Sequence, residues 1–156
     1  MRPLNLPAYE PRIREERPGR PDIFDPVRKK FVRLNPEEWV RQHFLNYLVH
    51  FKGFPASLIA VEASLNYNGL LKRSDILVYS PQGKPVLVVE CKAPEVEVTQ
   101  LVFDQAALYN MTLKVEFMVV TNGLEHFSCR IDHEQGDYVF LKQIPEYREL
   151  FGKDEN

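Results

Sequence analysis

The clearest hydrophobic pattern in the chain is that of an amphipathic helix beginning after residue 35. Apolar side chains recur there at helical spacing, namely Val40, Phe44, Tyr47, Leu48 and Phe51. Asn35 is a favourable N-cap, and Pro36 suits the first helical position because its ring presets the backbone angle. Gly53 and Pro55 end the pattern. We therefore expect a helix between Pro36 and Gly53.

Shorter apolar stretches follow, and most of them have the length and composition of β-strands. Strands are expected at residues 57–67, 74–80, 86–92, 115–121, 126–132 and 137–143. The third is the most apolar, so it is placed centrally. Asn68 and Gly69 predict the turn of a hairpin between the first two. A second helix is expected at 100–112 with Thr99 as its N-cap, and a short helix at 144–152.

This order of elements predicts an α/β fold with a mixed central sheet and helices on its faces. The first 34 residues differ from the rest because they contain six prolines among many charges. That composition predicts an extended N-terminal arm at residues 1–34, with at most a short ordered piece at 23–32. Residues 35–156 are then expected to form a single domain.

Composition limits the class of protein. Hydrophobic residues make up 44% of the 156 residues and charged residues 27%, which is ordinary for a soluble globular protein. No apolar run approaches the roughly 20 residues that a membrane span requires, and the N-terminus lacks the apolar segment of a secretory signal. Cys91 and Cys129 have no metal-binding spacing and suit a reducing compartment. We expect a cytoplasmic protein without a membrane partner.

The net charge of −2 is unevenly distributed along the chain. Residues 1–41 hold 10 Lys and Arg against 7 Asp and Glu, whereas residues 42–156 hold 10 against 15. Proteins that coat nucleic acids are usually far more basic. Any contact with a nucleic acid must therefore be local, through the arm or with the help of bound metal ions.

The candidate chemistry lies where two expected strands end. Side chains alternate along a strand, so Glu90 and Lys92 point to one side and Cys91 to the other. If the preceding strand is a neighbour, Asp75 converges with Glu90. Two such carboxylates repel each other unless a cation lies between them, and hard oxygen ligands favour Mg²⁺ or Mn²⁺. The alternative is that Glu90 and Lys92 form a surface ion pair.

Two helical positions add to this picture. Glu37 falls on the apolar side of the first helix and Glu38 does not, so Glu37 is expected to face inward, where a carboxylate needs a partner or a metal. The alternative role for Glu37 is that of a first-turn acid that interacts with the helix dipole. Gln105 and Tyr109 share one face of the second helix, and the alternative is an ordinary amphipathic edge.

Together these residues resemble the PD-(D/E)xK nuclease superfamily. Asp75 is followed by Glu90-Cys91-Lys92 on the next strand, Glu37 matches an acid on the first helix, and Gln105-x-x-x-Tyr109 resembles the Q-x-x-x-Y motif of the RecB-like branch. More closely, PEEWVRQHFLNYLV, KRSDILVY, VLVVECKAP, DQAALYN and VVTNG resemble the N-terminal nuclease domain of type I restriction enzyme R subunits, over roughly residues 35–130.

The resemblance implies a restriction-endonuclease-like α/β/α fold and Mg²⁺-dependent cleavage of DNA. Asp75 and Glu90 would be metal ligands, Lys92 the catalytic lysine and Glu37 an auxiliary ligand. By the same resemblance Gln105 and Tyr109 would position DNA or the lysine. Arg73 lies on the strand face of Asp75 and is expected to touch a phosphate.

The chain departs from the family in two respects. Ser74 stands where the superfamily motif has proline, and no GxxxxGK[ST] phosphate-binding loop is present in these residues. The domain is thus expected to stand alone, to pair as a homodimer, or to work with a translocase or specificity subunit. A catalytically idle nuclease fold that binds DNA or serves assembly is the alternative function. A nuclease for RNA or branched DNA is a third.

Overall fold

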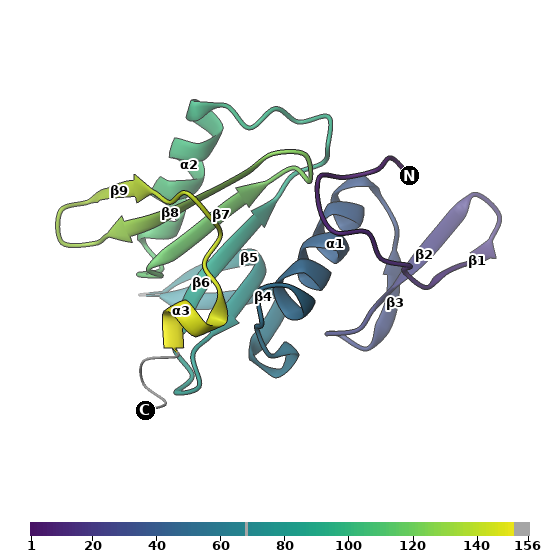
Figure 1. Ribbon diagram of the computed structural model, residues 1–156, viewed down its shortest axis with the longest axis horizontal. Helices are drawn as coiled ribbons and strands as arrows, with labels where there is room; N and C mark the ends of the chain where they lie inside the picture. The colour runs from purple at the N-terminus through teal and green to yellow at the C-terminus, as the bar shows by residue number, and fades with distance from the viewer. Residues whose placement is uncertain (68, 152–156) are drawn as a thin grey trace.

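A six-stranded mixed sheet forms the centre of the computed structural model, which describes residues 1–67 and 69–151 (Figure 1). Its strands follow chain order from edge to edge. They are β4 (Ile59–Tyr67), β5 (Leu70–Tyr79), β6 (Pro85–Cys91), β7 (Phe117–Thr121), β8 (His126–Asp132) and β9 (Asp137–Phe140). Only the β6–β7 pair among them is parallel. The expected α/β fold with a mixed central sheet is confirmed.

Two helices cover opposite faces of this sheet. Helix α1 (Pro36–His50) packs on one face, where Phe44 and Leu48 contact a core that includes Val89 of β6. Helix α2 (Gln100–Met111) packs on the other, where Phe103 joins the core of Val88. Because neighbouring residues of a buried strand point to opposite faces, β6 is apolar at almost every position. This explains its continuous apolar run.

Both long helices begin as the sequence predicts. The Asn35 side chain accepts a hydrogen bond from the backbone N–H of Glu38, and the Thr99 side chain accepts one from that of Val102. Helix α2 connects β6 to the parallel strand β7 as a crossover, a connection that parallel neighbours require. The crossover places the end of α2 beside the strand ends that carry the candidate chemistry.

The remaining elements differ from expectation mainly at their boundaries. A short 3-10 helix, η1 (Ala56–Leu58), precedes β4, and the C-terminal helix α3 (Tyr147–Phe151) is shorter than predicted, with Gly152 outside the described residues. Strand β5 starts at Leu70 rather than at residue 74. Strands β4 and β5 form the expected antiparallel hairpin, although Asn68 of its predicted turn lies outside the described residues.

The N-terminal region is more ordered than an extended arm with a short piece at 23–32. Residues 13–33 form a separate three-stranded antiparallel sheet of β1 (Ile13–Arg17), β2 (Arg20–Asp25) and β3 (Lys30–Arg33). Ile23 and Asp25 of β2 are completely buried. The restriction of ordered structure to residues 23–32 was wrong, because Pro18 and Pro26 lie in turns and Pro21 lies near the start of β2, where the sheet tolerates the missing N–H donor.

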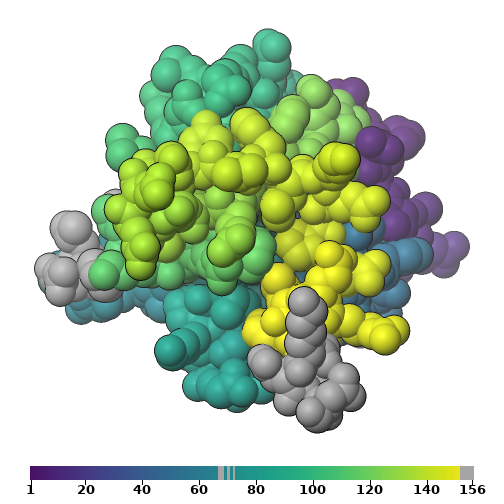
Figure 2. Space-filling model, turned by 60° about the vertical axis from the view of Figure 1, so that its left-hand side comes forward, coloured from purple at the N-terminus to yellow at the C-terminus, as the bar shows by residue number. Residues whose placement is uncertain are grey.

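The first residues of the chain also pack on the domain. The backbone N–H of Asn5 donates to the carbonyl of Gly123 at 2.8 Å, and Trp39 Nε1 donates to the carbonyl of Arg2 at 2.9 Å. In Figure 2 the purple N-terminal residues lie along one edge of the molecule, against the green of the β7–β8 region. Within the described residues, no helix has the length and apolar character needed to cross a membrane.

Candidate active site at the ends of strands β5 and β6

The candidate site forms where the pairing between β5 and β6 stops. The two strands are antiparallel, and their register ends with Ile76 opposite Val89. The next residues along are Asp75 and Glu90. Instead of a further pair of backbone hydrogen bonds, Asp75 Oδ2 accepts the N–H of Cys91 at 2.8 Å. A side-chain carboxylate thus takes the place of a backbone acceptor, which holds Asp75 at the opening between the strands.

Glu90 and Lys92 lie beyond this point on the same side of β6, as the alternation predicts. Lys92 Nζ is 3.4 Å from Glu90 Oε1, and each side chain is about one third exposed, at 33% and 32%. Cys91 points the other way into the core beneath α1 and is 2% exposed. The ion pair that was the alternative explanation for these residues is therefore present, and it lies at the rim of a cavity.

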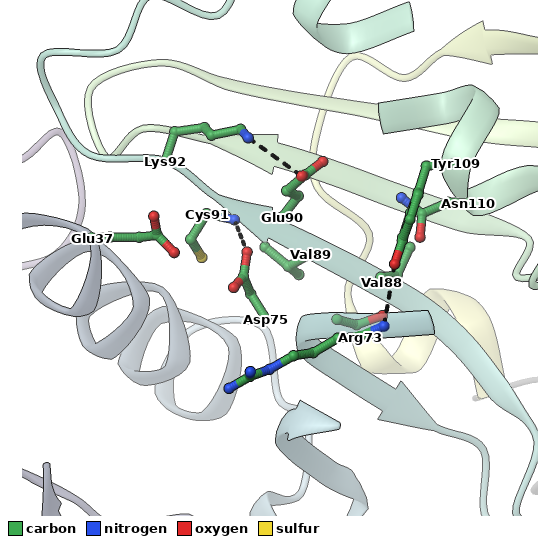
Figure 3. Close-up of a pocket in the computed structure, with 11 residues that line it drawn as sticks. Glu37, Arg73, Asp75, Val88, Val89, Glu90, Cys91, Lys92, Tyr109 and Asn110 are labelled. Atoms are coloured by element: carbon green, nitrogen blue, oxygen red, sulfur yellow. Dashed lines mark hydrogen bonds and ion pairs between the residues drawn. The ribbon is translucent and has the colours of Figure 1, made fainter. Parts of the chain in front are cut away.

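That cavity, of about 230 Å³, brings most of the predicted residues together (Figure 3). Its polar lining comes from α1, β5, the end of β6 and α2, and includes Glu37, Arg73, Asp75, Glu90, Lys92 and Tyr109. An adjoining groove is lined by Arg73, Glu90, Lys92, Gln105 and Tyr109. Every side chain singled out from the sequence therefore lines one of two neighbouring hollows.

The two acids at the start of α1 have exchanged their expected positions. Glu37 is exposed and faces the cavity from its edge, whereas Glu38 is 4% exposed. Glu38 was predicted to point away from the apolar side, and this was wrong. Its carboxylate is buried because it accepts hydrogen bonds from Arg28 Nη2, Arg41 Nε and Gln42 Nε2, all at 3.1 Å.

Tyr109 on α2 contacts β5 directly. Its hydroxyl oxygen accepts the backbone N–H of Arg73 at 3.2 Å, so the end of α2 is fixed to the strand that carries Asp75. Gln105 lies one turn earlier, exposed in the adjoining groove. Both side chains line the same groove, as their i, i+4 spacing predicts, and their role in positioning DNA or the lysine stays a prediction.

The surroundings of Asp75 disfavour its negative charge. Burial, with the negative charges of Glu37 and Glu90, raises the pKa of Asp75 to about 6, although the Cys91 N–H and Arg41 act in the opposite direction. Neighbouring carboxylates raise the pKa of a carboxyl group because each disfavours the charge of the other, and a cation between them would relieve this repulsion. The raised pKa of Asp75 therefore marks this cavity as a candidate functional site.

Residues 36–145 match the family described as "Type I restriction enzyme R protein N terminus (HSDR_N)". The chain belongs to this family. The matched segment contains every residue of the candidate site, and the resemblance to the N-terminal domain of type I restriction enzyme R subunits is confirmed. No curated protein matches the chain.

The fold of this R-protein N-terminal domain also has a counterpart among solved structures. A fragment of a putative HsdR subunit of a type I restriction enzyme from Vibrio vulnificus YJ016 is similar, with a TM-score of 0.52 and 24% sequence identity. The similarity covers 78% of this chain and 26% of that one, so the chain spans about a quarter of that structure. At this identity the likeness concerns the fold.

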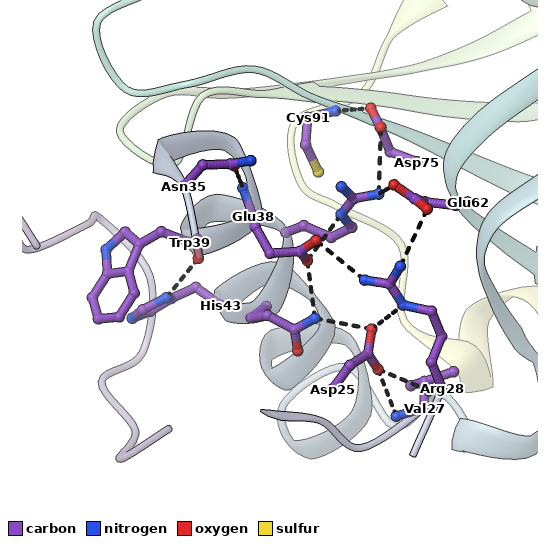
Figure 4. A network of polar contacts seen from close by, with 12 residues as sticks. Asp25, Val27, Arg28, Asn35, Glu38, Trp39, His43, Glu62, Asp75 and Cys91 are labelled. Carbon is purple, nitrogen blue, oxygen red and sulfur yellow. Dashed lines mark hydrogen bonds and ion pairs between the residues drawn. The ribbon is translucent and has the colours of Figure 1, made fainter. Parts of the chain in front are cut away.

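One set of site residues in the R-protein N-terminal domain was not predicted from sequence. Behind Asp75, positive and negative side chains alternate in a row (Figure 4). Arg41 lies near Asp75 and Glu62. Arg28 lies near Glu62, Glu38 and Asp25. We call this row the charge network, consisting of Asp25, Arg28, Glu38, Arg41 and Glu62. It joins the small N-terminal sheet to the candidate site through α1.

Glu62 of β4 is the junction of the charge network. Its carboxylate oxygens lie 3.2 Å from Arg28 Nη1, 3.3 Å from Arg41 Nη1 and 2.9 Å from Arg73 Nη2. Its backbone has φ +53°, a conformation that costs energy for a residue with a side chain. A sequence signal existed, because an acid interrupts the apolar stretch of β4. Its partners are distant along the chain and could not be foreseen.

The carboxylates of the cavity suit a hard divalent cation. Among the described residues, no three Asp, Glu, His or Cys side chains are close enough to form a complete ligand set. Mg²⁺ usually takes only one or two protein carboxylates and completes its shell with waters and substrate phosphates. Asp75 and Glu90, with Glu37 at the edge of the same cavity, supply a donor set of that kind.

Proposed function

We propose that this domain is a metal-dependent DNA endonuclease domain of the restriction or repair type, a PD-(D/E)xK phosphodiester hydrolase. The observation that carries the proposal is the convergence of Asp75, Glu90 and Lys92 around one cavity at the ends of β5 and β6. Membership in the type I restriction enzyme R-protein N-terminal family supports it. Association with a translocase or specificity subunit, or with a second copy of the chain, belongs to the same proposal.

Asp75 and Glu90 would hold Mg²⁺ or Mn²⁺, with Glu37 as an auxiliary ligand. When bound, such an ion polarises a phosphate oxygen and lowers the pKa of a coordinated water. In the hydrolysis, a water oxygen bonds to phosphorus, one P–O ester bond breaks, and the leaving oxygen takes up a proton. Negative charge on the phosphate oxygens increases in the transition state, so groups that stabilise that charge accelerate the reaction.

Lys92 is the residue of the chain best placed for that task. Its Nζ lies at the cavity rim, 3.4 Å from Glu90 Oε1. An ammonium at this position stabilises the charge on the phosphate or orients the attacking water. Arg73, exposed at the same rim, would hold a neighbouring phosphate, and Gln105 and Tyr109 would position the strand in the adjoining groove.

One observation favours a second candidate, a catalytically idle fold that binds DNA or serves assembly. Lys92 is paired with Glu90, and a stable pair would leave neither group free to act. The pair is about one third exposed, however, and such pairs contribute little free energy. Substrate can therefore displace it at small cost, and the nuclease is the better supported function.

The test combines plasmid nicking with calorimetry of Mn²⁺ binding. The variants Asp75→Asn, Glu90→Gln and Lys92→Met keep the shapes of the side chains and remove their charges. We expect the two acid variants to lose both metal binding and nicking, and Lys92→Met to bind metal without nicking. Glu97→Gln, an exposed acid in the loop after β6, serves as the control. Metal binding without nicking by the wild type on any DNA would favour the idle fold.

A further inference from the structure

The outer face of the small N-terminal sheet gathers arginine and phenylalanine side chains. The register places Phe24 opposite Phe31, Arg14 opposite Asp22 and Asp22 opposite Arg33. Because paired residues of adjacent strands point to the same side, these positions form one surface. We call it the arginine face, consisting of Arg12, Arg14, Asp22, Phe24, Phe31 and Arg33. The sheet lies outside the segment that matches the R-protein family.

The opposite side of the same sheet is used for packing. Ile23 and Asp25, which alternate with Phe24 along β2, are completely buried. Asp25 accepts hydrogen bonds from Gln42 of α1 at 3.0 Å and from Arg28 at 2.6 Å. Figure 1 shows the sheet at one end of the molecule, beyond α1. The arginine face is therefore the side turned away from the core.

Two arginines of this face are stacked on aromatic rings. The Arg14 guanidinium lies 4.0 Å from the Phe31 ring centre, and Arg12 lies 4.7 Å from Phe24 and 5.5 Å from Phe31. Stacking fixes the plane of a guanidinium and leaves the N–H groups at its edge available for a phosphate. Arg14 also approaches Glu16 at 3.3 Å and Asp22 at 3.8 Å, pairs between exposed or partly exposed side chains that a phosphate can replace.

Charge complementarity identifies the occupant. Residues 12–33 hold 8 Lys and Arg against 4 Asp and Glu, whereas the remaining residues hold 12 against 18. The candidate active site itself contributes three carboxylates to its cavity. Arg73 and Lys92 line the same cavity and offset only part of this negative charge, so without a bound cation the cavity attracts a phosphate backbone weakly. A second, basic surface would supply the rest of the affinity.

We propose that the arginine face binds the phosphate backbone of DNA and that the small sheet serves as a clamp for the substrate, an inference that rests on the proposed nuclease function. The clamp is joined to the site by charged contacts. Arg28, in the β2–β3 turn, pairs with Glu38 of α1 at 3.1 Å and with Glu62 of β4 at 3.2 Å. Arg41 continues the connection to Asp75.

The experiment measures binding without cleavage. Fluorescence anisotropy of a short labelled DNA duplex is followed over a range of salt concentrations in EDTA, with the whole chain carrying Asp75→Asn. Each lost phosphate contact reduces the slope of log K against log salt by about 0.9. We expect Arg14→Gln with Arg33→Gln to reduce the slope by about 1.8 and to weaken binding roughly ten-fold at low salt.

Two further variants make the result specific. Arg130→Gln with Lys142→Gln removes the same charge from exposed positions on β8 and after β9, and should leave the slope unchanged. Arg33→Gln alone keeps both arginine–phenylalanine stacks and should lower the slope by about 0.9, which separates lost contacts from lost folding. Equal slopes for the Asp75→Asn parent and the arginine-face variants, or no binding by that parent, would overturn the clamp.

This test also distinguishes the clamp from the nuclease. If the protein binds DNA in a salt-dependent way through the arginine face but never nicks it, the clamp is supported and the nuclease function is excluded. If the double variant Arg14→Gln with Arg33→Gln nicks and binds DNA as before, the nuclease function is supported and the DNA clamp is excluded.

Discussion

The guanidinium of Arg41 lies directly behind the carboxylate of Asp75, with Nη1 3.7 Å from Oδ1. The same Nη1 is 3.3 Å from Glu62, and Nε is 3.1 Å from Glu38. Arg41 is 6% exposed, and its Nη1 makes ion pairs without a well-aligned hydrogen bond. A buried cation thus holds three acids from α1, β4 and β5 together, and one of them is the central residue of the candidate site.

Removal of Arg41 should destabilise the domain strongly. Arg41→Met leaves the buried acid Glu38 and the partly buried Asp75 and Glu62 without this cation, and loss of one partner of a buried pair costs about 3–5 kcal/mol. The measurement is urea unfolding at neutral pH. Arg73→Met is the matched control, because the Arg73 side chain is 67% exposed and its ion pair should contribute less than about 1 kcal/mol. Similar losses for both variants would contradict the role given to Arg41.

Asp75 should lower the stability of the metal-free protein as the pH rises. Its pKa is about 6 in the folded protein and 3.8 ordinarily, so the folded state binds the proton more tightly. At low pH the group is protonated in both states. Between those two values the unfolded chain ionises first, which favours unfolding, and the penalty reaches up to about 3 kcal/mol above pH 6.

Asp75→Asn tests this directly because asparagine stays neutral at every pH and can still accept the Cys91 N–H. Unfolding in EDTA should show the variant more stable than the wild type at pH 7, with an advantage that shrinks as the pH falls toward 4. A variant that is less stable than the wild type at pH 7 would contradict the raised pKa.

A divalent cation should reverse this order of stability. At a free Mn²⁺ concentration of 100 times Kd, binding to the folded state alone adds about 2.7 kcal/mol. The wild-type melting temperature should therefore rise on addition of Mn²⁺, while those of Asp75→Asn and Glu90→Gln should stay nearly constant. Ca²⁺ provides a comparison with a larger ion. An equal rise of the melting temperature in the wild type and in both variants would show that the metal binds outside the site of Asp75 and Glu90.

Gly123 should be required for the packing of the N-terminal residues. A Cβ at this position would lie 2.9 Å from Leu4 Cδ2 and 3.1 Å from Val40 Cγ2, and the backbone has φ +86°. Gly136 has φ +71° with no atom within 4 Å of its Cβ position. Gly136→Ala should therefore cost about 1 kcal/mol from the backbone alone, and Gly123→Ala about 2–3 kcal/mol. Equal costs by thermal unfolding would show that Leu4 moves aside freely.

Local sequence signals predicted the elements that carry the site. The helix caps at Asn35 and Thr99 depend only on residues near in sequence, and so does the continuous apolar run of β6. These elements could therefore be predicted without knowledge of the fold. The convergence of Asp75 with Glu90 was also predictable, because alternation and strand adjacency place both on one side. Strand alternation and helical spacing also singled out Lys92, Gln105 and Tyr109, the family resemblance assigned them to one site, and in the structure all three line one groove.

The tertiary structure alone decided what lies behind these residues. The helical wheel placed Glu37 inward and Glu38 outward, but Arg28, from the β2–β3 turn, and Arg41 draw the Glu38 carboxylate into the interior. Likewise, the proline-rich N-terminal residues form a sheet because their apolar and acidic side chains find partners on α1. Helical periodicity and composition describe short-range preferences, whereas the burial of a charge depends on partners that only the folded chain brings together.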